Sequence, residues 1–316
     1  MKDAQKFKEG IGFGFLYGLL FLVIILVPGI ELLTLFVLPI PFVLYASRYG
    51  YRSTLFLGGV ILVLSVFLSL FLFIGTLPLT LLAVSTGTLL GHAIYQKRHP
   101  YETWALGSVG VTFGLVIIFV MIQVFSQVDL IEQYQLVVDE SVKTTQSMAE
   151  STGIQLSKDD MELIEKQMNQ IITLLPSVLV LAAIVIAFVT QWTSYKVISW
   201  RGNKRLAFPP FRTFQLPKSL IWIFFIAILL AWFPLEETGS LATGVLNTTN
   251  LIGNLLSLQG FSFILFYCHQ KRLSNAYPIL IIISSVIFLP IGLYMTKILG
   301  IIDIGFGLRG KMEQTK

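Results

Sequence analysis

Residues 126–173 read SQVDLIEQYQLVVDESVKTTQSMAESTGIQLSKDDMELIEKQMNQIIT and form the one long stretch with the composition of a water-exposed segment. The stretch holds nine acidic and three basic residues, so its net charge is −6. Apolar residues recur every three or four positions on both sides of Ser151-Thr152-Gly153, which is typical of two amphipathic helices joined by a turn. We expect an antiparallel helical hairpin that continues the flanking membrane helices for roughly 30 Å. The alternative is two separate amphipathic helices that lie on the membrane surface.

The apolar stripes of this hairpin are the surfaces that we expect to pack against each other. Ser157, followed by Asp159 and Asp160, has the pattern of a helix N-terminus. The stripe before the turn consists of Ile131, Tyr134, Val138 and Val142, and the stripe after it of Met161, Ile164, Met168, Ile171 and Leu175.

The chain as a whole is far more apolar than a soluble protein. Its 316 residues are 55% hydrophobic and 12% charged, with a mean hydropathy of +0.80, whereas soluble domains have about 25% charged residues. We therefore predict an all-α, polytopic transmembrane helical bundle with eight or nine spans and an extracytoplasmic acidic helical hairpin. The hairpin, residues 126–173, separates a membrane half at 1–125 with five spans from a second half at 174–316 with three or four.

Charge sorting gives the orientation of the predicted spans. Fifteen of the 22 Lys and Arg residues fall in segments on one side, so we expect a cytoplasmic N-terminus and a cytoplasmic loop at 196–218. That loop combines six basic residues with aromatic ones and has no acid, which favours an anionic lipid leaflet rather than nucleic acid. The nine spans lie at 12–27, 32–46, 54–74, 77–95, 104–125, 174–195, 219–233, 246–268 and 277–298.

The C-terminal tail conflicts with this count. Nine spans place the tail outside, with Lys297, Arg309, Lys311 and Lys316, against the rule that basic residues stay inside. Either the tail is tolerated outside, or one span is re-entrant and eight cross the membrane.

Motifs of known catalytic chemistry are absent from the sequence. It has no HExxH, no GxSxG, no phosphate-binding loop with GK[ST] and no CxxC. A single cysteine, Cys268, excludes a disulfide within the chain. We therefore predict no enzymatic activity, no catalytic residue, no metal site and no cofactor.

The small residues around the first span and the polar residues within later spans are the candidates for binding a partner or a ligand. Small residues four apart let another helix approach closely, so Gly10, Gly14 and Gly18 could pack inside this chain or dock a partner subunit. Amides on one helix face line either a ligand cavity or a hydrogen-bonded helix interface. These candidate ligand-binding residues are Asn247, Asn250, Asn254 and Ser257, with Gln123 as a further buried amide.

Three short motifs, in order along the chain, carry a resemblance to a known family. Leu38-Pro39-Ile40-Pro41 runs on to Tyr49-Gly50, Phe208-Pro209-Pro210-Phe211 precedes Leu216-Pro217, and Gln259-Gly260 lies in a late span. In these motifs the chain resembles the YybS family of bacterial membrane proteins, whose function is unknown. Its tail, with Asp303, Phe306 and Arg309, has fewer aromatic residues than the family often shows.

This family is distantly similar to the substrate-binding subunits of energy-coupling-factor vitamin transporters. The resemblance implies a location in the bacterial cytoplasmic membrane, a small-molecule ligand and a membrane-protein partner such as a coupling subunit. Our first hypothesis is accordingly a transporter-like protein that binds a small molecule and lacks its own ATPase. The second is a scaffold that does not transport and holds partners through the hairpin and the basic loop.

Overall fold

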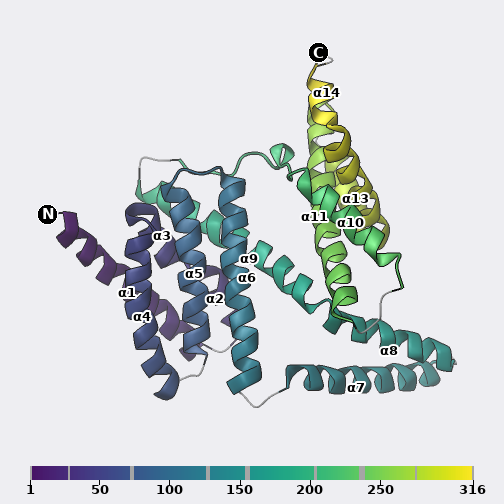
Figure 1. Ribbon diagram of the computed structural model, residues 1–316, viewed down its shortest axis with the longest axis horizontal. Coiled ribbons are helices and arrows are strands. Elements are labelled where there is room, and N and C mark those ends of the chain that lie inside the picture. The colour runs from purple at the N-terminus through teal and green to yellow at the C-terminus, as the bar shows by residue number, and fades with distance from the viewer. Residues whose placement is uncertain are drawn as a thin grey trace. The chain divides into compact units, whose positions relative to one another are not determined.

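The structure is a computed structural model that describes residues 2–27, 29–71, 75–125, 129–153, 157–202, 205–234, 239–274 and 276–314. These residues are helical almost throughout and contain no strand (Figure 1). Seven of the helices are long and apolar enough to cross a membrane. The predicted class, a polytopic helical membrane protein, is confirmed. Three further apolar helices are shorter, with 10–17 residues, so the number of spans stays a prediction.

The chain divides into two compact units, and the first comprises residues 1–169 and 179–208. Its helices are α1 (Lys2–Leu26), α2 (Glu31–Val37), α3 (Ile40–Tyr49), α4 (Tyr51–Phe71), α5 (Thr76–Tyr95), α6 (Pro100–Phe125), α7 (Leu130–Ser151), and most of α8 (Lys158–Thr173) and of α9 (Leu175–Arg201).

The core of the first unit is built around α5, which packs between α3 and α6. A Cβ atom added at Gly91 would lie 2.6 Å from the carbonyl oxygen of Val43, and one at Gly114 would lie 2.6 Å from Leu82. Only glycine allows helices to approach so closely. The predicted second span breaks at Pro39, because proline lacks the amide that would continue α2 into α3.

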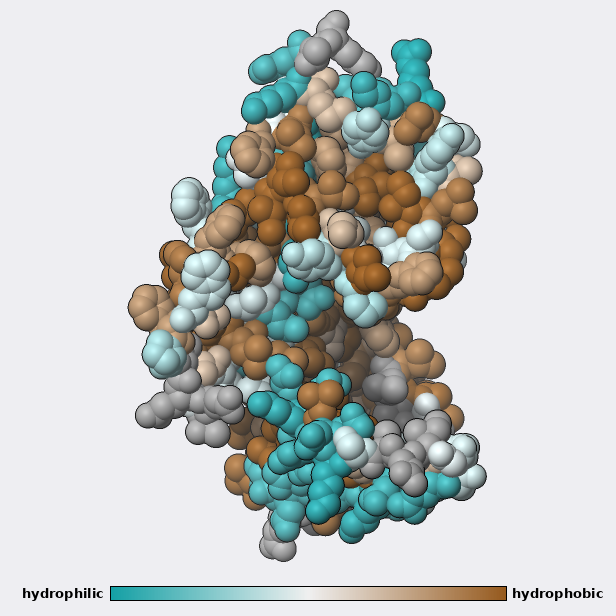
Figure 2. Space-filling view, turned by 90° about the vertical axis from the view of Figure 1, so that its right-hand side faces the viewer, coloured by the Kyte–Doolittle hydropathy of each residue, from teal (hydrophilic) through white to brown (hydrophobic). Residues whose placement is uncertain are grey.

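The acidic stretch forms α7 and α8, which lie side by side in Figure 1. The Tyr134 hydroxyl donates to the carbonyl of Met168 at 2.8 Å, and Val138 is only 1% exposed. The two stripes therefore do meet, as expected for a hairpin. The placement of Ile131 and Ile171 in the buried stripes is wrong, since their side chains are 40% and 52% exposed. Figure 2 shows the hydrophilic side chains gathered over these two helices.

Both hairpin helices begin at acidic caps. The Asp160 amide donates to the Ser157 hydroxyl at 3.1 Å, and the Ser157 amide donates to the Asp160 carboxylate at 3.0 Å. This reciprocal pair confirms the predicted helix start. The hydrogen bonds from Ser157 hold the pKa of the Asp160 carboxyl below its usual range. Asp129 caps α7 in a similar way, so α7 is a helix separate from α6, and the predicted continuation of that membrane helix into the hairpin is wrong.

The second unit comprises residues 170–178 and 209–316. Its elements are one turn of 3-10 helix, η1 (Phe211–Thr213), and the helices α10 (Ser219–Ala231), α11 (Ser240–Gln270), α12 (Ala276–Ile287), α13 (Leu289–Phe306) and α14 (Leu308–Gln314). The predicted single span at 277–298 is therefore wrong, because the chain breaks at Phe288 between α12 and α13.

The helices α11 and α13 are the closely packed core of this unit, and they run in the same direction. Gly253 on α11 lies beside Lys297 on α13, and the side chain of Gln259 donates to Asp303. In both pairs the residue on α13 lies 44 positions after its partner on α11, as expected for helices that run in the same direction. Further on, the side chain of Gln270 donates to the carbonyl of Met312. The C-terminal α14 thus lies at the same end of the unit as the C-terminus of α11.

Candidate functional site

A cluster of buried polar side chains joins α11, α13 and α14 within the second unit. It consists of Gln259, Ser262, Asp303 and Arg309, here called the Arg309 cluster, and these residues are at most 6% exposed. Arg309 enters the cluster because Gly307, with φ of 60°, ends α13 in a left-handed turn that leads directly into α14.

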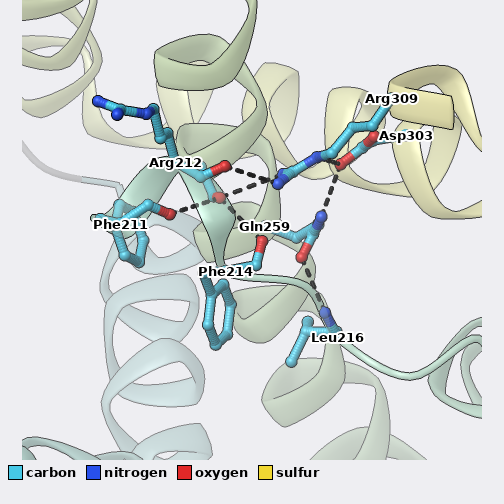
Figure 3. Close-up of polar contacts among 8 residues, drawn as sticks. Phe211, Arg212, Phe214, Leu216, Gln259, Asp303 and Arg309 are labelled. Carbon is cyan, nitrogen blue, oxygen red and sulfur yellow. Dashed lines mark hydrogen bonds and ion pairs between the residues drawn. The ribbon is translucent and has the colours of Figure 1, made fainter. Parts of the chain in front are cut away.

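The centre of the cluster is an ion pair between Arg309 and Asp303. The Nε atom of Arg309 donates to Oδ2 of Asp303 at 2.9 Å, and Gln259 donates to the same oxygen at 2.6 Å. The remaining arms of the guanidinium donate to the carbonyl of Arg212 at 2.8 Å and to the hydroxyl of Ser262 at 3.1 Å. One rigid fork therefore connects three separate segments (Figure 3).

The same cluster fixes the loop that precedes α10. The Ser262 hydroxyl lies 2.8 Å from the carbonyl oxygen of Phe211 and 2.9 Å from that of Phe214, either of which can accept its proton. The amide of Leu216 donates to Gln259 at 3.0 Å. Phe211 and Leu216 of the two proline motifs, Gln259 and the tail therefore come together at one place, although each motif is short.

Burying a charge pair among membrane helices costs free energy, so such a pair usually has a structural or functional role. Removing two charges from water costs several kcal/mol per ion, and good geometry repays that cost only in part. The second carboxylate oxygen of Asp303, Oδ1, has no hydrogen-bond partner in the described part of the chain. Ionisable residues within membrane segments most often mark functional sites. We therefore treat the cluster and its surroundings as the candidate site.

A cavity of about 470 Å³ lies next to the cluster in the same unit. We call it the Arg212 cavity, because Arg212 shapes both: its carbonyl accepts from Arg309, while its side chain points away from the cluster in Figure 3. The described lining residues include no Asp or Glu. They are Pro210, Phe211, Arg212, Leu265, Cys268, His269, Arg272, Leu273 and Pro278.

Arg272 has an unusual backbone for a residue with a side chain. Its φ is 52°, in the left-handed region that normally favours glycine. Its amide donates to the His269 carbonyl, and the Leu273 amide donates to the Cys268 carbonyl, which together form the Schellman motif at the end of α11. A cation therefore occupies a cavity position where glycine would strain the backbone less.

The predicted asparagine face belongs to a helix interface in the second unit. The Asn247 side chain donates to the Thr173 carbonyl at 2.7 Å and accepts from the Ser177 amide at 2.9 Å. Asn250 accepts from the Ser177 hydroxyl at 3.3 Å, and Asn254 donates to the carbonyl of Asn250 at 2.9 Å. These contacts match the interface alternative. A ligand-binding role for these residues stays a prediction.

The other predicted site residues have mostly local partners. Ser257 donates to the Leu293 carbonyl at 2.9 Å and so ties α11 to α13. Gln123 is half-buried, not buried as expected, and donates to the Asp129 carboxylate at 3.1 Å, where it supports the cap of α7.

The small-residue face of α1 is used partly inside the chain. A Cβ atom added at Gly10 would lie 3.3 Å from the Tyr45 hydroxyl, and one at Gly14 would lie 3.6 Å from Ile61. Gly18 has open space beside it. Docking of a partner subunit on this face stays a prediction.

The sequence pattern did not identify Ser262, Asp303 and Arg309 as parts of a site. A signal was available, since Asp303 is an acid in an apolar helix of 18 residues that could cross a membrane. The described residues contain no group of three or more His, Cys, Asp or Glu that could hold a metal ion.

The comparisons with known proteins agree on one family. A family model described as "Predicted membrane protein (DUF2232)" matches residues 15–304. The chain is also 26% identical over 315 residues to "Uncharacterized protein YybS" of Bacillus subtilis (strain 168), which covers 99% of this chain and 100% of that protein. No solved structure matches the chain.

Proposed function

Because this chain belongs to the DUF2232 family of predicted membrane proteins, we propose that it is a multi-pass bacterial membrane protein that binds a small anionic molecule. The binding site is the Arg212 cavity. The observation that carries the proposal is that Arg212, His269 and Arg272 line this cavity without a described acid among them. The volume of about 470 Å³ falls in the usual range for small-molecule sites.

The Arg309 cluster serves this site as a rigid base. Arg309 and Ser262 hold the loop that carries Arg212, so the position of the Arg212 guanidinium depends on the buried ion pair. A loop held by several hydrogen bonds loses little entropy when a ligand binds, which favours affinity. In this role the protein is transporter-like, without an ATPase or a catalytic step of its own, and a coupling subunit supplies any energy.

The proposed orientation follows from the basic residues. The N-terminus, the loop at 196–218 and the Arg212 cavity face the cytoplasm, and the acidic hairpin lies outside. Cysteine at Ser147 in a Cys268→Ser background should react with a reagent that cannot cross the membrane. If the cysteine at position 147 reacts only after the membrane is permeabilised, the hairpin lies inside and the proposed topology is wrong.

The single cysteine of the chain allows a direct test of the cavity's charge. Cys268 lines the cavity, so its reaction rates with an anionic and a cationic methanethiosulfonate reagent report the local potential. A charge roughly 8 Å away at an effective dielectric constant of about 40 contributes about 1 kcal/mol, or roughly fivefold in rate. Arg212→Gln with Arg272→Gln should therefore lower the anionic-to-cationic rate ratio by tenfold or more.

The matched control is Lys218→Gln, which removes one charge from the same loop outside the cavity. Its rate ratio should stay close to wild type. An unchanged ratio in the double arginine variant would mean that the cavity is not an anion site. If the ratio falls as expected, mass spectrometry of the protein released from native membranes should identify the bound molecule by its mass. The same molecule should be lost in the double variant.

A scaffold function remains the second candidate, because one observation favours it. Leu136 and Val137 on α7 are 62% and 57% exposed, although this helix carries the hydrophilic surface of Figure 2. Exposed apolar surface rimmed by polar residues is one of the features that mark protein interaction sites. Leu136→Ser with Val137→Ser should abolish chemical cross-links to a membrane partner if the hairpin holds one, and leave the Cys268 rate ratio unchanged.

A further inference from the structure

The first unit contains a second and larger cavity, with a volume of about 1040 Å³. We call it the Lys97 cavity. Ends of α3, α5 and α9, the start of α6 and the segment after α9 surround it. Its lining includes the basic residues Arg48, Lys97, Arg98 and Arg205 beside apolar side chains.

The charge of the Lys97 cavity is entirely of one sign. Four of its described lining residues are Lys or Arg, and none is Asp or Glu. Arg48 has a carboxylate partner, Glu9, at 2.7 Å. Lys97, Arg98 and Arg205 form no ion pair within the described residues, so three positive charges there are not neutralised by the chain. A cavity with this balance attracts anions.

Lys97 repeats the backbone pattern of Arg272. Its φ is 56°, and these two are the non-glycine residues with positive φ in the described part of the chain. The Lys97 amide donates to the Ile94 carbonyl and the Arg98 amide to the Ala93 carbonyl, again a Schellman motif. Backbone strain of this kind is most often found at functional sites. At both helix ends, the residue in the strained position is a cation that lines a cavity.

The wall of the cavity that carries Arg205 is held in place. The Leu206 amide donates to the Ser199 hydroxyl at 3.0 Å. Phe208 packs against the rings of Phe188 and Tyr195, with centroids 5.0 and 5.5 Å apart. Since the residues that directly follow Arg205 are held in this way, the wall that carries Arg205 is part of a formed site.

We propose that the Lys97 cavity binds an amphiphile with an anionic, phosphate-bearing head, and that its source is an anionic phospholipid. The cations bind the phosphate, while Leu44, Ile94 and Ile198 contact the apolar part of the molecule. Basic pockets near the cytoplasmic ends of membrane helices suit such headgroups. A free organic phosphate offers the same chemistry and is distinguished below. This site lies in the first unit and does not depend on the function proposed for the Arg212 cavity.

The test measures which lipid the full-length protein retains. The protein is reconstituted in phosphatidylcholine vesicles in which one lipid in five is phosphatidylglycerol, extracted with a mild neutral detergent, and its bound lipids are quantified by mass spectrometry. We expect the wild type to be enriched in phosphatidylglycerol. Lys97→Gln, Arg98→Gln and Arg205→Gln together should reduce the enrichment at least threefold. The matched control, Lys196→Gln, Lys218→Gln and Lys271→Gln, removes equal charge outside the cavity and should keep it.

A single substitution separates binding from folding. Lys97→Gly removes one cavity charge and relieves the left-handed backbone, so we expect an equal or higher melting temperature together with at least a twofold loss of enrichment. A residue with a purely structural role would not give this combination.

Soluble glycerol 1-phosphate, at an ionic strength matched with chloride, tests the other source. If it raises the melting temperature of the wild type but not of the triple variant, while lipid retention is the same in both, the ligand is a free phosphate compound. If neither measurement separates the triple variant from the wild type, or if the control loses as much enrichment, the proposed site is wrong.

Discussion

Replacing Arg309 by methionine tests whether the buried ion pair organises the second unit. The substitution leaves the Asp303 carboxylate, which is 3% exposed, with Gln259 as its hydrogen-bond donor. It also removes the donors to the Arg212 carbonyl and the Ser262 hydroxyl. Breaking a buried pair from one side costs about 3–5 kcal/mol.

The expected loss is large enough to measure. Each kcal/mol lowers the melting midpoint of a protein of this size by roughly 1.5 °C, so Arg309→Met should lower it by at least about 4 °C. The assay heats the detergent-solubilised protein and determines, by size-exclusion chromatography, the fraction that remains monodisperse. Arg309→Lys is the matched variant, since it keeps the charge but loses the fork that reaches three acceptors. The melting midpoint of Arg309→Lys should lie between those of the wild type and Arg309→Met.

A double-mutant cycle decides whether the pair itself is responsible. Asp303→Leu with Arg309→Met removes both charges, so no buried charge is left alone. We expect the double variant to lose about 2 kcal/mol less than the sum of the two single variants, since contacting residues couple by up to about 3 kcal/mol. Strictly additive effects would refute the view that Arg309 stabilises the unit through Asp303.

Three further variants test other parts of the structure. Gly260→Ala places a Cβ atom against the Thr296 carbonyl, so it should separate α11 from α13 and reduce the stability by about 1–3 kcal/mol, seen as a lower melting midpoint; an unchanged midpoint would contradict their close contact. Val138→Asp buries a charge between α7 and α8 and should expose the hairpin to protease, and equal resistance would show that the helices do not pack. Asn250→Leu with Asn254→Leu should melt nearly as wild type, because interhelical bonds in membranes average about 0.6 kcal/mol; full cellular function would refute a ligand role for this face.

Local patterns were sufficient to predict the helices. The capping pattern at Ser157 and the stripe through Tyr134 and Val138 depend on residues that are close in sequence, and both occur in the structure. Ile131 shares the spacing of the stripe but is exposed, since it lies in the first turn of α7, before the contact of Tyr134 with Met168. Spacing gives the face of a helix, but it does not give the length of the contact.

The Arg309 cluster could not be predicted in this way, because its members are far apart in the chain. Arg309 contacts Ser262 and the carbonyl of Arg212, which are 47 and 97 positions away. The motifs that contain Phe211 and Gln259 are far apart in the sequence, and nothing in their spacing indicates that the segments touch. Their contact depends on α13 running parallel to α11, which is a property of the tertiary structure.

The parallel arrangement of α11 and α13 also bears on which side of the membrane the basic tail lies. α12 has 12 residues, or about 18 Å at 1.5 Å per residue, which is too short for a hydrocarbon core of about 30 Å. Phe288 breaks the helix, and Pro290 in the first turn of α13 needs no amide donor. Because α13 then follows the direction of α11, Arg309 and Lys311 lie at the end of the unit where α11 leads into Lys271 and Arg272. A tail on the same side as these bases obeys the positive-inside rule, so the re-entrant alternative removes the conflict that nine full spans create.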